Sequence, residues 1–243
     1  MSLNHALRSI VSLCAGFTVI LALALPPPAV AGAQGRHAAT ATVTNWRLAR
    51  DFRIGAQASN PNPDRMGNAA VWYFMIGTDL SDPGAFTLLP AFVGRWDHIR
   101  RLAGWLTRPS HELRAPWAGV NKSGETQYPI TLTWPEQTAA VHPGQGGVNA
   151  IVGWRSPITG TVHVRVTFSD LDANYGDGIT WAIDKDAATL MSGLLPNGGA
   201  PQTRSLTIEV SAGTFLYFAV GPNGDYGWDS TGVDVTIRPV AQG

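Results

Sequence analysis

The sequence predicts an all-β protein: an antiparallel, jelly-roll-like β-sandwich with a short helix and irregular β segments in its N-terminal half. Residues 161–168, 206–210 and 233–237 carry apolar side chains at every second position, which is the period of a strand with one buried face. Each of these faces needs a cover, and a second packed sheet is the simplest one. We expect the sandwich module to span residues 137–240.

Residues 1–33 have the order of a secretory signal peptide. Arg8 precedes the uncharged apolar run 10–25, which three prolines end before the small residues Ala31 and Ala33. A membrane anchor is the alternative, but the run is shorter than the roughly 20 residues that span a bilayer. The sequence therefore predicts a secreted, extracellular protein, with no membrane span after cleavage behind Ala31 or Ala33.

Composition limits the function classes. Cys14, the one cysteine of the chain, lies within the signal, so the mature chain has no disulfides, thiolate ligands or cysteine nucleophile. Acidic and basic residues number 17 each. This balance gives no net field for nucleic acid or for an anionic membrane, so we expect no nucleic-acid partner.

The N-terminal half is expected to be a β-rich segment, residues 45–136, that packs on the sandwich after a flexible leader, residues 34–44. Residues 69–77 form a continuous apolar run of strand length. Residues 86–93 predict a second strand, which Pro90 restricts to an edge or a bulge.

Residues 97–106 are predicted to form the short helix. Ile99, Leu102 and Leu106 recur there at steps of three and four residues, and Asp97 stands at the start. The arginines around this segment are interpreted as a solvated face, because no phosphate-binding glycine loop accompanies them.

Several motifs occur together in the C-terminal half. They are HPG at 142–144, VGWRSP at 152–157 followed by GTV, FSDLD at 168–172, GDGITW at 176–181 and GPNGDYGWDSTG at 221–232. In combination they resemble a β-sandwich module of bacterial secreted and surface proteins. That module is similar to jelly-roll carbohydrate-binding modules, so the resemblance implies glycan binding.

An acidic loop is the candidate metal site. Asp170, Asp172, Asn174 and Asp177 lie within eight residues, and alternating loop carboxylates are typical ligands of Ca²⁺. The spacing differs from an EF-hand, because Trp181 stands where the bidentate glutamate belongs. The alternative is that these side chains bond their own backbone in a turn.

Aromatic residues give the candidate ligand site. Tyr226 and Trp228 occupy a glycine-rich turn, and Tyr175 lies in the acidic loop. Exposed rings of this kind stack on sugars, although a tryptophan in a glycine-rich turn can also pack over the end of a sandwich. Trp154 and Trp181 share strand faces with aliphatic residues, so we expect both in the core.

We therefore expect a non-catalytic binding protein for a carbohydrate or a cell-envelope glycan. One alternative is a structural or adhesion module that binds a protein at the cell surface, and another is a glycan hydrolase. The sequence provides no catalytic residue: His142 before Pro143 is interpreted as a turn residue, and no pair of histidines has zinc-binding spacing.

Overall fold

The computed structural model describes residues 45–241, which form two antiparallel β-sheets. The predicted signal peptide, residues 1–33, and the predicted leader, residues 34–44, lie outside the described residues. Within the described residues, no helix is long and apolar enough to cross a membrane. The predicted fold class, an all-β antiparallel sandwich, is confirmed.

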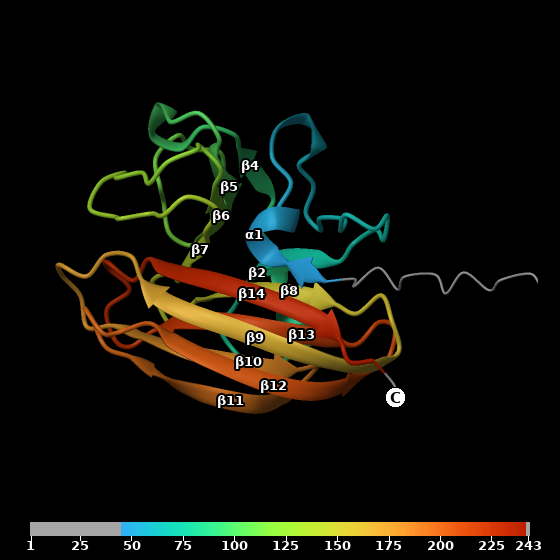
Figure 1. The fold of residues 1–243 in the computed structure, drawn as a ribbon. Helices are drawn as coiled ribbons and strands as arrows, with labels where there is room; N and C mark the ends of the chain where they lie inside the picture. Colours follow the sequence, from blue (N-terminus) through green and yellow to red (C-terminus); the bar gives the residue numbers. More distant parts are fainter. Residues whose placement is uncertain (1–44, 242–243) are drawn as a thin grey trace, which may run out of the picture. The chain divides into compact units, whose positions relative to one another are not determined.

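The first sheet has the order β12-β9-β14-β7-β6-β5-β4, and β1 pairs with β14 beside that path. In Figure 1, β9 and β14 lie side by side across the front of the molecule. The strands of this sheet are β1 (Trp46–Arg47), β4 (Ala91–Val93), β5 (Leu102–Leu106), β6 (Trp117–Asn121), β7 (Ala139–His142), β9 (Gly160–Asp170), β12 (Gln202–Val210) and β14 (Thr231–Pro239).

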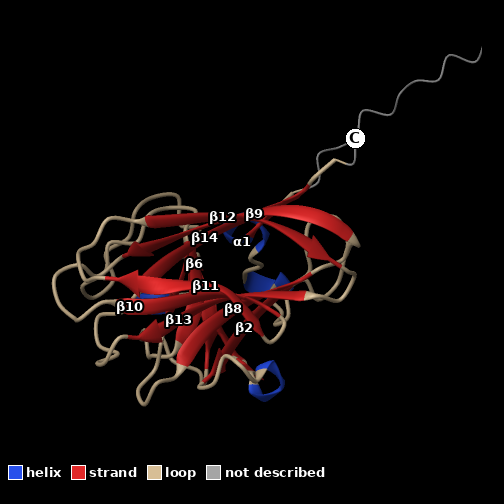
Figure 2. Cartoon of the chain, turned by 90° about the horizontal axis from the view of Figure 1, so that it is seen from below, coloured by secondary structure: helices blue, strands red, loops and turns tan. Residues whose placement is uncertain are grey.

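The second sheet has the order β11-β10-β13-β8-β2-β3. Figure 2 shows this layer, with β10, β13, β8 and β2, facing the layer that holds β12, β9 and β14. Its strands are β2 (Trp72–Gly77), β3 (Thr87–Leu88), β8 (Asn149–Arg155), β10 (Ile179–Lys185), β11 (Ala188–Leu195) and β13 (Phe215–Pro222). Each sheet thus contains strands from both halves of the chain.

The helical segments described are short. They are α1 (Leu48–Asp51) and the 3-10 turns η1 (Gly55–Gln57), η2 (Pro83–Ala85) and η3 (Trp96–His98).

The core lies between the two sheets and follows the predicted alternation. The apolar faces of β9 and β14 are buried completely: Val162, Val164, Val166, Phe168, Val233, Val235 and Ile237. Trp154 and Trp181 are also buried, as expected, and Trp181 stacks on Phe168 with ring centroids 5.2 Å apart.

The helix predicted over residues 97–106 is wrong. Residues 96–98 form η3, and β5 occupies Leu102–Leu106 with every side chain buried. The cause is tertiary packing: the Trp96 ring fills the space that a Cβ would occupy at Gly104 and at Gly119 of the neighbouring strand β6. This close approach fixes β5 as a strand. Both faces of β5 are covered, so its apolar residues do not alternate with polar ones, and their spacing resembled that of a helix.

Residues 86–93 do not form one strand. They form β3, which pairs with β2 in the second sheet, and β4, which pairs with β5 in the first. Pro90 lies between the two. Because proline has no backbone N–H for a ladder, the break falls where the chain crosses from one sheet to the other.

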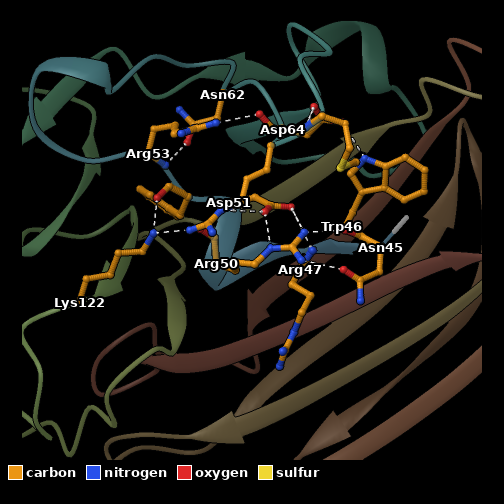
Figure 3. A network of polar contacts seen from close by, with 12 residues as sticks. Asn45, Trp46, Arg47, Arg50, Asp51, Arg53, Asn62, Asp64 and Lys122 are labelled. Atoms are coloured by element: carbon orange, nitrogen blue, oxygen red, sulfur yellow. Dashed lines mark hydrogen bonds and ion pairs between the residues drawn. The ribbon is translucent and has the colours of Figure 1, made fainter. Parts of the chain in front are cut away.

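A buried polar network holds the N-terminal segment (Figure 3). Asp64 accepts four hydrogen bonds: from the Trp46 indole at 2.9 Å, from the Met66 backbone, and from the backbone and side chain of Asn68. Asp51 accepts from the Arg50 guanidinium at 2.7 Å and from the Arg47 backbone at 3.1 Å. We call these contacts the N-terminal anchor.

Lys122 attaches this anchor to the sandwich. Its ammonium group donates to the backbone carbonyls of Arg50 and Phe52 at 3.1 and 2.6 Å, as Figure 3 shows. Burial and the neighbouring Arg65 lower the pKa of Lys122 to about 8. The loop after β6 is thereby joined to α1.

Candidate functional site

A cleft of about 640 Å³ opens at one end of the sandwich. Its walls come from four loops and one strand end that are distant in the sequence: residues 108–117, residues 130–132, His142 at the end of β7, Asp172 after β9, and residues 225–230 between β13 and β14. Loops of the N-terminal half therefore complete a site on the C-terminal half. We call it the end cleft.

Two apolar side chains of the end cleft are exposed on a left-handed backbone. Trp228 has φ 64° and is 44% exposed, and Ile130 has φ 57° and is 70% exposed. A left-handed conformation costs an L-residue about 1 kcal/mol or more, and it is an outlier for a β-branched residue. Neither side chain offsets this cost by burial. Such an arrangement is typical of functional sites.

The interior of the end cleft is aromatic. Tyr226 meets the His142 ring edge-on, with centroids 6.3 Å apart, and His142 in turn lies 5.9 Å from the ring of Trp117. Trp117 is buried and stacks on Trp134 at 5.2 Å. The buried rings of Trp117 and Trp134 are thus connected through His142 to the half-buried ring of Tyr226.

His142, which lines the cleft, has a neutral ring. Its Nδ1 lies 2.7 Å from the Pro143 carbonyl oxygen, so Nδ1 carries the proton and Nε2 is left as the acceptor. Burial lowers the pKa of His142 to about 4, against the opposing effect of the Pro143 carbonyl. The ring is therefore neutral at physiological pH.

Charged residues of both signs line the end cleft. Arg108, Arg114, Asp172 and Asp225 all line it, and Arg114 also forms an ion pair with Glu112. The Asp172 carboxylate is buried and accepts a hydrogen bond from Thr131 at 2.8 Å, while burial and then the neighbouring Asp170 raise its pKa. The mixed charges favour neither an anion nor a cation, but they supply donors and acceptors for hydroxyl groups.

A second, much smaller cavity lies behind Trp228. It measures about 10 Å³, and its lining residues include Asp170, Asn197 and Asp229. Trp228 borders both spaces. We call this space the acidic cavity.

Asp229 is the unusual residue of the acidic cavity. Its side chain is buried at 2% exposure, and neither carboxylate oxygen has a hydrogen-bond partner among the described residues. Burial, followed by the carboxylates of Asp177, Asp225, Asp170 and Asp172, raises the pKa of Asp229 to about 8. Five acidic side chains thus share one end of the sandwich, and the most buried of them is unpaired.

Turn hydrogen bonds hold the two loops that carry these acids. Asp170 accepts from the backbone of Asp172 at 2.8 Å and of Gly198 at 2.7 Å, and Asp177 accepts from the backbone of Asp225 at 3.1 Å. Gly176, at φ 101°, lies so close to the opposite loop that an added Cβ would be 3.1 Å from the Gly227 carbonyl oxygen. The loops are therefore packed against each other.

The structure brings together some of the residues that the sequence predicted. Tyr226 and Trp228 line the end cleft, and Tyr175 is 60% exposed with its ring 5.5 Å from that of Trp228. Asp170 lines the acidic cavity and Asp172 the end cleft, whereas Asp177 contacts the opposite loop. Asn174 is exposed and lines neither space.

Sequence reasoning did not single out Ile130 or Asn197; it interpreted Arg108 as part of a solvated face and His142 as a turn residue only. In residues 45–241, no group of three or more His, Cys, Asp or Glu side chains is arranged to hold a metal ion by itself. The predicted ligand set Asp170, Asp172, Asn174 and Asp177 is thus not assembled as a complete cage in the described part of the chain.

Comparisons with known proteins give distant structural neighbours. No protein-family profile and no curated protein matches the chain. Similar solved structures include the C-terminal CBM6 of LamC, a marine laminarinase from Zobellia galactanivorans, at 20% identity and a TM-score of 0.25, covering 42% of this chain and 87% of that one.

Two further neighbours are also carbohydrate-binding modules. CBM51 from Clostridium perfringens GH95, solved in complex with methyl-galactose, has 11% identity and a TM-score of 0.31, covering 47% of this chain and 77% of its own. A family 35 module from Clostridium thermocellum has 12% identity and a TM-score of 0.28, covering 41% and 85%. These likenesses are distant, with TM-scores of 0.25 to 0.31.

Proposed function

We propose that this chain is a secreted, non-catalytic protein that binds a carbohydrate, a glycan of a cell envelope, in the end cleft. The observation that carries the proposal is the pair of exposed apolar side chains, Trp228 and Ile130, that the fold holds on a left-handed backbone in one cleft. Neither side chain belongs to a buried hydrophobic cluster of the fold.

A sugar fits the chemistry of the cleft. The face of a pyranose ring carries C–H groups that stack on Trp228 and on Tyr226, and its hydroxyls both donate and accept hydrogen bonds. The neutral Nε2 of His142 accepts, the two arginines donate, and Asp225 accepts. The volume of about 640 Å³ is within the usual range for small-ligand sites.

Binding fits the geometry better than hydrolysis. A glycosidase uses two carboxyl groups that both reach the scissile bond. Asp172 and Asp225 line the end cleft, but Asp172 is buried, with one oxygen bonded to Thr131 and the other buried without a partner. Asp172 lines the cleft, but at 4% exposure its carboxyl group has little surface to offer a scissile bond.

Glycan-array binding of the purified protein tests this function, with Trp228→Ala and Tyr226→Ala as the variants. Each ring contributes of the order of 1.4 kcal/mol or more, so we expect at least tenfold weaker binding for either variant. Tyr128→Ala is the matched control, because Tyr128 is 70% exposed but does not line the cleft.

Binding to whole cell envelopes separates a glycan from a protein partner. Periodate oxidation of the envelopes destroys sugar diols and is expected to abolish binding, whereas protease treatment is not. The reverse result would favour the adhesion alternative. Recovery of the protein outside the cell, with an N-terminus just after Ala31 or Ala33, tests secretion.

A further inference from the structure

Positive and negative side chains reach the end cleft on separate loops. The loop between β5 and β6 carries Arg108 and Arg114, and both line the cleft. The loop that follows β9 and the loop that precedes β14 contain no lysine, arginine or histidine, and they line the cleft with Asp172 and Asp225. The sign of the charge in the cleft thus depends on which loop supplies it.

The strand order of the first sheet keeps these loops apart. β7 lies between β14 and β6, and the pairs Thr231–Val141 and His142–Trp117 align the ends of these three strands. Because neighbouring strands are about 4.8 Å apart, the loop before β14 and the loop before β6 are separated by two strand spacings, on the order of 10 Å. The end cleft therefore has a positive side and a negative side.

A second segment strengthens the positive side. Residues 94–101 lie beside the loop of residues 107–116, because the ring of His98 stacks on that of His111 with centroids 5.8 Å apart. Together the two segments hold five arginines and two acids. Arg108 is exposed and takes part in no salt bridge within residues 45–241. Its guanidinium group is thus available to a ligand in the cleft.

Asp225 supplies the exposed carboxylate of the negative side. One of its oxygens accepts a hydrogen bond from the Gly227 backbone at 3.0 Å, and its own backbone N–H donates to the Asp177 side chain at 3.1 Å. These bonds hold the loop in place. Unlike Asp172 and Asp229, which are buried, Asp225 offers its carboxylate at the surface of the cleft.

Aromatic rings lie between the two sides. Trp117 at the start of β6 and His142 at the end of β7 are in contact, and His142 contacts Tyr226 in turn. A sugar ring that packs in the middle of the cleft therefore has polar groups of opposite charge at its two ends. Hydrogen bonds between charged partners are roughly twice as strong as those between neutral ones, so a ligand with matching charges gains most.

We propose that the end cleft selects a zwitterionic glycan, a short oligosaccharide whose ammonium group pairs with Asp225 and whose carboxylate pairs with Arg108. A guanidinium group matches a carboxylate with two parallel hydrogen bonds. A glycan with charge of one sign only meets like charge on the other side of the cleft. This inference rests on the proposed function, because a cleft that binds no glycan cannot select one.

Four forms of one oligosaccharide test the selection by isothermal titration of the purified protein. They are a hyaluronan tetrasaccharide, which is anionic, its de-N-acetylated form, which is zwitterionic, its carboxyl-reduced form, which is neutral, and the form with both changes, which is cationic. The buffer is mildly acidic, so that the amines are protonated, and low in salt, so that charges are weakly screened.

We expect the zwitterion to bind most tightly, about fivefold or more above the neutral form, and to lose this advantage in high salt. Equal affinity for the neutral form and the zwitterion, or tighter binding of a singly charged form, overturns the selection and leaves the proposed function in place. Binding of none of the four also overturns the selection. The glycan array decides separately whether the cleft binds any sugar.

Two variants locate the charges. Arg108→Gln is expected to reduce the preference for the zwitterion over the cationic form, and Asp225→Asn the preference for the zwitterion over the anionic form. Asparagine keeps an oxygen for the Gly227 backbone N–H. Arg100→Gln and Asp82→Asn are the matched controls, because both side chains are exposed and line no part of the cleft. If the preferences of all four variants equal those of the wild type, the assignment fails.

Discussion

The N-terminal anchor and the acidic cavity both contain buried carboxylates, but only the anchor supplies them with hydrogen-bond donors. Asp64, 1% exposed, accepts four hydrogen bonds within the anchor, and Asp51 is bonded to Arg50 and to the backbone of Arg47. Asp229, at 2% exposure, accepts none among the described residues. Asp64 and Asp229 are thus buried to nearly the same extent, but only Asp64 is hydrogen-bonded.

This difference teaches how to separate a structural polar group from a ligand site. A fully paired buried carboxylate has its role inside the fold, where it fixes the path of the chain. A buried carboxylate without partners does not stabilise the fold in this way: burial, followed by four neighbouring acids, raises the pKa of Asp229 to about 8. The same reasoning applies to apolar groups: Trp46 is buried in the anchor, whereas Trp228 is exposed on a left-handed backbone.

The largest expected effect is a loss of stability when the N-terminal anchor is disrupted. Asp64→Ala leaves the Trp46 indole and the backbone N–H groups of Met66 and Asn68 without their acceptor, so we expect the free energy of unfolding to fall by about 3 kcal/mol. Urea unfolding measures it. Asp79→Ala removes an exposed carboxylate that bonds only Ser81, and its midpoint should not move; equal losses in the two variants would refute the structural role of the anchor.

The next effect concerns His142 and pH. Its folded pKa of about 4 lies below the ordinary value of 6.5, so the folded protein binds fewer protons between these values. Stability is therefore lost as the pH falls from about 6.5 to about 4, by at most roughly 3 kcal/mol. Urea midpoints of the wild type and of His142→Gln across this range isolate the effect. Parallel pH profiles would contradict a buried, neutral His142.

A smaller loss of stability is expected when the contact between the acidic loop and the opposite loop is disturbed. Gly176→Ala adds a Cβ at φ 101° and 3.1 Å from the Gly227 carbonyl oxygen, whereas Gly124→Ala adds one at φ 107° with nothing within 4 Å. Both should lose about 1 kcal/mol to backbone strain, and Gly176→Ala about 1 kcal/mol more. Chemical unfolding of the pair measures the contact between the two loops. Identical losses would mean that the loops are not packed together.

The sequence predicted the parts of the fold that depend on local pattern. The period of two in β9 and β14 gave their buried faces, and the placement of Trp154 and Trp181 in the core was correct. The predicted helix over residues 97–106 failed because β5 is buried on both faces, which removes the alternation that identifies a strand. Its neighbour Trp96, which fills the space above Gly104, is a contact that no local pattern contains.

The candidate site was predictable only in pieces. Tyr226 and Trp228 were expected to be exposed because their turn is rich in glycine, and Asp170 was noted because it begins an acidic run. Asn197 and Asp229 line the same cavity as Asp170, although they lie far from it in the sequence. The left-handed backbone at Ile130 likewise depends on how its loop packs, and a β-branched residue gives no sign of it.

The contrast between the paired and the unpaired carboxylate is tested most directly by two isosteric variants, Asp64→Asn and Asp229→Asn, unfolded in urea in the presence of EDTA. We predict that Asp64→Asn lowers the unfolding midpoint clearly and that Asp229→Asn leaves it unchanged or raises it. Equal destabilisation by both variants would show that Asp229 is already satisfied within the fold, and it would contradict the contrast between the two carboxylates.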